Sequence, residues 1–147
     1  MDLSTMNPKA RTFAEALVER FPRFLRNLSV EKGGEFEAFV WAPPGSNAGA
    51  LVCQSFRGDV WVRFAPGQTG CCCESVPDFV KTVRDLLAGK LAITVVSKRG
   101  LWVETSLHPA GSKRKVGRGQ TVATYSWSAS ARRRRSLSRR PKRRTAK

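Results

Sequence analysis

Residues 50–65, ALVCQSF-RG-DVWVRFA, contain the pattern that decides the fold. Two runs rich in apolar, β-branched and aromatic residues, 50–56 and 59–65, are separated only by Arg57-Gly58. Such a two-residue connection ending in glycine is typical of a tight hairpin turn, because glycine adopts positive φ at little cost. The sequence therefore predicts an antiparallel β-hairpin near the middle of the chain.

Further strands are predicted on both sides of this hairpin. Residues 35–42 are rich in aromatic side chains, and the cysteines at 71–73 are expected to begin or pair with a short fourth strand. Residues 91–97 are apolar and β-branched, which suits a central strand buried on both faces. Residues 101–107 return after a short turn, and 119–128 suit a last edge strand.

Two helices are predicted from their start signals. Asn7-Pro8 combines an N-cap residue with proline at the first helical position. An apolar stripe follows at three- and four-residue steps: Phe13, Leu17, Phe21, Phe24, Leu25 and Leu28. Pro22 is expected to kink or break this helix. Ser75 and Asp78 begin a second helix, which Gly89 ends.

This order of elements predicts an α+β fold. We expect an antiparallel sheet of about five to seven strands with two helices packed on one face, in the order α-βββ(β)-α-ββ(β). The predicted domain organisation is an N-terminal extension at 1–7, a single domain at 8–128 and a disordered tail at 129–147.

The charge of the chain is concentrated at its C-terminal end. The whole sequence has a net charge of +16, yet residues 1–111 contain 13 Lys and Arg against 11 Asp and Glu. Residues 113–147 contain the other 14 basic residues and no acid. The body is therefore nearly neutral, and the end of the chain predicts affinity for polyanions.

The basic tail supplies the candidate nucleic-acid-binding residues: Arg132, Arg133, Arg134, Arg135, Arg139, Arg140, Lys142, Arg143 and Arg144. Arginine suits phosphate oxygens because its planar guanidinium donates two parallel hydrogen bonds. Binding of this kind depends mainly on counterion release and is independent of base sequence. A nuclear-import signal at 140–144, attachment to an anionic membrane surface, and a merely solubilising tail remain alternatives.

A candidate partner face lies on two of the predicted strands. If Val60, Val62 and Phe64 face the core, alternation places Trp61 and Arg63 on the opposite face. If Leu101, Val103 and Thr105 face the core, Trp102 and Glu104 lie opposite in the same way. Trp and Arg are favoured anchors at protein interfaces, and Trp also stacks on unpaired bases.

The sequence contains no assembled catalytic, cofactor or metal motif, so no cofactor and no metal are predicted. Alternation places Cys71 and Cys73 on one strand face and Cys72 on the other, and three adjacent cysteines lack the spacing of a zinc site. His108, the only histidine, precedes a proline and is expected in a surface turn. Cys72 with His108 is the single Cys–His pair that the composition allows, which leaves a thiol-dependent enzyme as a minor alternative.

The leading interpretation is a non-enzymatic interaction domain with a nucleic-acid-binding tail. The order of elements resembles small α+β partner-binding proteins such as secretion chaperones and immunity proteins, at the level of fold analogy only. This resemblance implies the alternative, a protein-partner module in which the tail is incidental. With neither a secretory pattern at the N-terminus nor a long apolar run, we expect an intracellular, cytoplasmic protein, or a nuclear one if the source has a nucleus.

Overall fold

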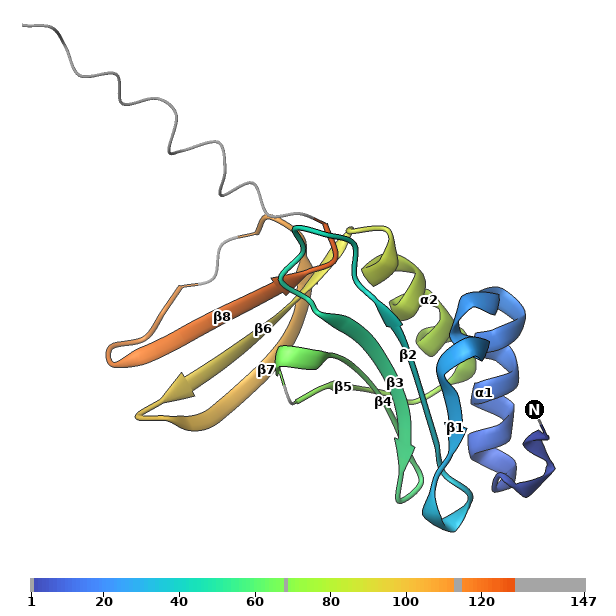
Figure 1. Ribbon diagram of the computed structural model, residues 1–147. Coiled ribbons are helices and arrows are strands. Elements are labelled where there is room, and N and C mark those ends of the chain that lie inside the picture. Colours follow the sequence, from blue (N-terminus) through green and yellow to red (C-terminus); the bar gives the residue numbers. More distant parts are fainter. Residues whose placement is uncertain (1, 68, 113–114, 129–147) are drawn as a thin grey trace, which may run out of the picture.

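The computed structural model describes residues 2–67, 69–112 and 115–128 (Figure 1). Within these residues the α-helices are α1 (Pro8–Arg20) and α2 (Val76–Leu87), beside short 3-10 helices, and the strands are β1 (Leu28–Val30), β2 (Phe36–Trp41), β3 (Ala50–Phe56), β4 (Asp59–Phe64), β5 (Cys71–Cys73), β6 (Leu91–Lys98), β7 (Leu101–Pro109) and β8 (Gln120–Ser126). All strand pairs are antiparallel. The predicted α+β class is confirmed, but the strands form two sheets, β1-β2-β3-β4-β5 and β7-β6-β8.

Both helices begin where the sequence predicts. The Oδ1 of Asn7 accepts a hydrogen bond from the backbone N–H of Ala10 at 2.8 Å. Ser75 caps α2 in the same way, its Oγ accepting from the N–H of Asp78 at 3.2 Å. The helix α1 ends before Pro22, and the chain continues as a 3-10 turn (Pro22–Asn27). Leu28, which the helical stripe included, already belongs to β1.

The predicted central hairpin is the β3–β4 connection. Phe56 pairs with Asp59, and the two residues between them have positive φ, 49° at Arg57 and 83° at Gly58. Two consecutive left-handed residues match the right-handed twist of paired strands, which is why this turn type closes hairpins. The hairpin fixes the register of the five-stranded sheet.

The core lies between the helices and one face of the five-stranded sheet. Its largest fully buried side chains include Leu17 of α1, Phe36 and Leu51 of the sheet, and Phe79 of α2. Met6, which the sequence places in an N-terminal extension, is 4% exposed and belongs to the same core. The folded body therefore includes residues that precede α1.

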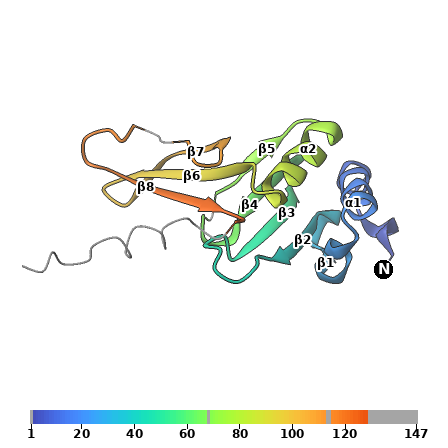
Figure 2. The ribbon, with the colours of Figure 1, turned by 90° about the horizontal axis from the view of Figure 1, so that it is seen from above.

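The three-stranded sheet extends from the other side of the five-stranded sheet, away from the helices (Figure 2). It is attached where β8 ends: the buried ring of Trp127 stacks on Phe64, with ring centroids 6.3 Å apart. The loop between β2 and β3 also holds it, because Ser46 Oγ donates to the carbonyl of Ser126 at 2.7 Å. From this attachment the two sheets diverge, as Figure 1 shows.

Candidate functional site

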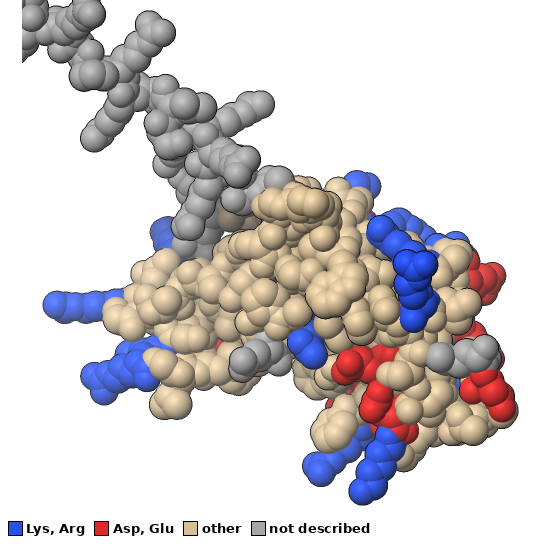
Figure 3. All heavy atoms as spheres, viewed as in Figure 1, with Lys and Arg blue, Asp and Glu red and all other residues tan. Residues whose placement is uncertain are grey.

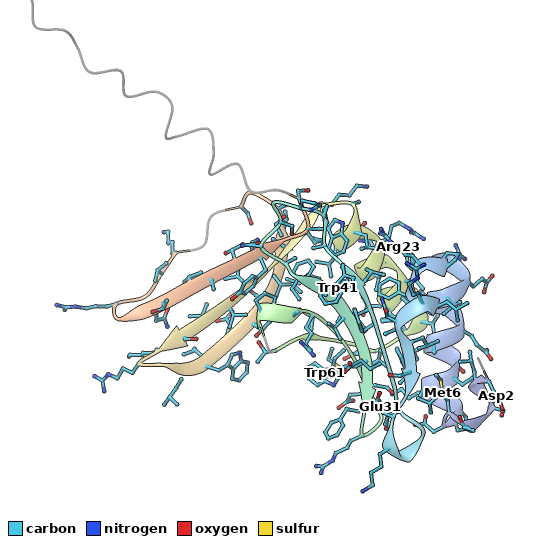
Figure 4. The ribbon with its side chains drawn as sticks, viewed as in Figure 1. Asp2, Met6, Arg23, Glu31, Trp41 and Trp61 are labelled. Atoms are coloured by element: carbon cyan, nitrogen blue, oxygen red, sulfur yellow. The ribbon has the colours of Figure 1, made fainter. Side chains whose placement is uncertain are left out.

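The face of the five-stranded sheet opposite the helices, called here the outer face, presents aromatic and polar side chains. Pairing and alternation place on it Phe39, Trp41, Gln54, Phe56, Trp61 and Arg63. Val60, Val62 and Phe64 are fully buried on the inner face, so Trp61 and Arg63 of β4 lie on the side that the sequence predicts. Figure 4 shows Trp41 and Trp61 on the side that looks toward the three-stranded sheet.

Where the two sheets diverge there is an open pocket of about 480 Å³, called here the groove. Its lining comes from the outer face, the β3–β4 turn, the segment before β5, and β7: Gln54, Phe56, Arg57, Asp59, Trp61, Arg63, Thr69, Gly70 and Trp102. A volume of this size falls within the range of about 300–1,000 Å³ typical of ligand sites. The groove therefore combines three of the four side chains of the predicted partner face.

The fourth, Glu104, is separated from Trp102 by a β-bulge. Along β6, Val96 pairs with Glu104, but the next residue, Ser97, pairs with Trp102, so Val103 is an extra residue in β7. Neighbouring positions on β6 face opposite sides, and their partners do the same. Trp102 therefore faces the groove, while Glu104 lies on the opposite face of the three-stranded sheet.

The prediction that Leu101 and Val103 face the core is wrong. Their exposed fractions are 72% and 41%, because the three-stranded sheet projects beyond the helices and β7 is one of its edges. An apolar alternation identifies a strand, but it does not show whether anything covers the strand.

A short hydrogen-bond chain fixes the Trp102 ring at the groove. Its Nε1–H donates to the Oγ1 of Thr105 at 2.9 Å, and Thr105 Oγ1 is bonded to the Oγ1 of Thr69, another groove residue. Trp102 is nevertheless 59% exposed. Because the polar edge of the indole is satisfied within the protein, the exposed part of the ring is an apolar, π-electron surface.

The groove carries two guanidinium groups, from Arg57 and Arg63, and one carboxylate, from Asp59. Lys81 and Asp85 form the single ion pair found among residues 2–67, 69–112 and 115–128, so neither arginine forms an ion pair with a carboxylate in that part of the chain. The Arg57 guanidinium lies 5.1 Å from the centroid of the Phe56 ring. Figure 3 shows a face that is largely uncharged, with Lys and Arg scattered over it and at its edges and with Asp and Glu gathered at its lower right.

Phe56 and Arg57 were not predicted to be functional residues, because the sequence pattern identifies them only as the end of a strand and as part of a turn. Their positions carry a usable signal, since Phe56 alternates with Gln54 along β3 and so shares the outer face. Thr69 gave no such signal, because its place depends on the packing of one sheet against the other.

As alternation predicts, Cys71 and Cys73 lie on one face of β5 and Cys72 on the other; Cys73 is buried, as is Cys53 of β3, and Cys72 is exposed on the outer face. Burial raises the pKa of Cys53 well above its ordinary value and that of Cys73 to about 12. Burial, followed by the carboxylates of Asp59 and Glu74, also raises the pKa of Cys72. These surroundings disfavour the nucleophilic thiolate.

His108 lies within β7 and not in a turn. Its Nε2 is bonded to the Oγ1 of Thr94 on β6, and its Nδ1 lies 2.8 Å from the Oγ of Ser112. Both ring nitrogens are thus engaged by hydroxyl groups, so the Cys72–His108 pairing that composition allows gains no support from these contacts.

The nine basic residues predicted to bind nucleic acid, from Arg132 to Arg144, lie outside the described residues. Among the helices of the described part, none has the length and apolarity that crossing a membrane requires. Comparison of the chain with protein-family models, with curated proteins and with solved structures finds no match.

Proposed function

We propose that this protein binds nucleic acid, with its basic C-terminal segment supplying electrostatic, sequence-independent affinity. The observation that carries the proposal is the separation of charge, with 14 Lys and Arg and no acid in residues 113–147 beside a nearly neutral body. A segment of this composition neutralises phosphates and releases their counterions, which yields affinity without base specificity. The arginine-bearing groove supports the proposal, since it adds cationic groups on the folded body.

The test is a salt titration of binding to a labelled duplex and a labelled single strand, followed by fluorescence anisotropy. If about eight phosphates of a duplex are neutralised, the logarithm of the affinity falls against the logarithm of salt concentration with a slope of roughly −7. We expect a truncated chain ending at Ala129 to lose most of this affinity and this slope. Unchanged thermal unfolding would show that the body remains folded.

A matched control separates charge from mere chain length. Replacing Arg132, Arg133, Arg134 and Arg135 by lysine preserves the charge, so most of the affinity is expected to remain. Replacing the same four by glutamine is expected to reduce the affinity and flatten the slope by roughly 3–4. Absence of binding to either probe at about 0.15 M salt would refute the proposal and favour the protein-partner module.

A further inference from the structure

We infer that the groove is a site for unpaired bases, so that the folded body prefers single-stranded to duplex nucleic acid. This inference rests on the proposed function and deepens it: the tail binds any polyanion, and the groove distinguishes single-stranded from duplex nucleic acid. The site would take a flexible strand whose bases insert between the diverging sheets while its phosphates lie toward the arginines.

The first support is the pair of indole rings. Trp61 from β4 and Trp102 from β7 line one cavity, although they belong to different sheets. Trp102 is exposed and Trp61 is half-buried, and the accessible part of each ring is suited to stacking, which every base supports through its π-face. In a duplex these faces are covered by neighbouring base pairs, so only an unpaired base is available to the groove.

The second support is preorganisation. The bonds from Trp102 to Thr105 and from Thr105 to Thr69 tie the ring to the segment before β5 before any ligand arrives. A ring held in place loses less conformational freedom when a base stacks on it. The indole N–H is already satisfied, so the ring offers its face and not a hydrogen-bond donor.

The third support is the charge and polarity of the lining. Arg57 and Arg63 have no carboxylate within ion-pair distance in the described part of the chain, and guanidinium groups bind phosphate or stack on bases. The lining also includes Gln54 and Thr69, whose side chains can hydrogen-bond to base edges. With the Asp59 carboxylate the lining still has an excess of one positive charge, a combination of cationic and polar groups that an apolar groove for a protein segment would not need.

The experiment uses the full chain and three labelled probes of one length, about 12 nucleotides, within the span of roughly 4–16 that a single-strand-binding fold occupies. The probes are oligothymidylate, the corresponding duplex, and an abasic strand that keeps the phosphates but lacks the bases. Wild-type protein is expected to bind oligothymidylate more tightly than the abasic strand, because only the former has rings to stack.

The variants are Trp61→Ala and Trp102→Ala, with Trp102→Phe to restore a stacking ring. Each alanine variant is expected to lower affinity for oligothymidylate by about 5- to 150-fold, the range for losing one aromatic–base stack. Affinity for the duplex and for the abasic strand is expected to stay within twofold. Leu101→Ala is the matched control, because Leu101 is an exposed apolar residue of the same strand outside the groove.

The outcomes separate the two proposals. If wild-type protein binds the duplex and the abasic strand but the tryptophan variants change no affinity, the tail proposal stands and the groove inference is overturned. If all three affinities fall together, stacking on bases is likewise refuted. If wild-type protein binds none of the probes, both proposals fail, and the groove becomes a candidate site for a protein partner.

Discussion

Trp127 is the residue whose loss should separate the two sheets. Its ring is 7% exposed, stacks on Phe64 of β4, and lies 5.8 Å from the guanidinium of Arg23. It directly follows β8, so it connects the edge of the three-stranded sheet to the main core. Replacing a buried tryptophan by alanine removes this contact and leaves a cavity, at a cost of about 3–5 kcal/mol. For a domain with a stability of about 5–15 kcal/mol, this loss is at least a fifth of the total.

Urea unfolding followed by far-UV circular dichroism measures this loss, since the signal comes mainly from the backbone and its unfolding midpoint can be compared between variants. We expect Trp127→Phe to retain more than half of the contribution, because a phenyl ring can still stack on Phe64. Trp41→Ala is the matched control: this tryptophan is 71% exposed, and its loss should change stability by no more than about 0.5 kcal/mol. A loss below about 1 kcal/mol for Trp127→Ala would refute the idea that this ring joins the sheets.

Three further outcomes are expected. Asn7→Ala removes the cap of α1 and should lower the free energy of unfolding by about 1 kcal/mol, whereas Asn7→Ser should retain most of it, as urea midpoints will show. The hydrogen bond from Lys81 lowers the pKa of Asp85, so its stabilisation is present at neutral pH and is lost as the pH falls through the lowered pKa. Wild type and Asp85→Asn should therefore differ in urea midpoint at neutral pH and converge in strong acid. Mass spectrometry after brief alkylation should find Cys72 modified first, with Cys73 protected until the protein unfolds; early labelling of Cys73 would contradict its burial.

Local structure could be predicted well from the sequence, because its signals are local. The cap at Asn7 and the hairpin at Arg57-Gly58 each depend on a few adjacent residues, and both are confirmed. Alternation along β4 placed Trp61 and Arg63 opposite the core for the same reason. Leu28 was assigned wrongly because one apolar residue at helical spacing looks the same whether the helix continues or a strand begins.

What could not be predicted depends on contacts between distant segments. Nothing in the composition of β6 shows that it pairs with β7 and β8 in a sheet of its own. The groove exists because that second sheet diverges from the first, so its volume and the position of Thr69 follow from tertiary packing. The bulge in β7 likewise leaves no mark in the alternation of residues 101–107, which is why Glu104 was grouped with Trp102.

The bulge also determines where β7 can lose one residue without turning its side chains to the other face of the sheet. Trp102 and Thr105 are three residues apart, an odd spacing that puts side chains of a regular strand on opposite faces; the extra Val103 is what brings them together. Deleting Val103 would shorten β7 yet leave an even spacing, so both side chains would still face the groove. Deleting Glu104 would have the same effect, because Val103 would then take the place opposite Val96, whereas deleting a residue between Thr105 and His108 would invert part of the strand. In related chains, a one-residue gap should therefore be found at Val103 or Glu104 more readily than at later positions of β7.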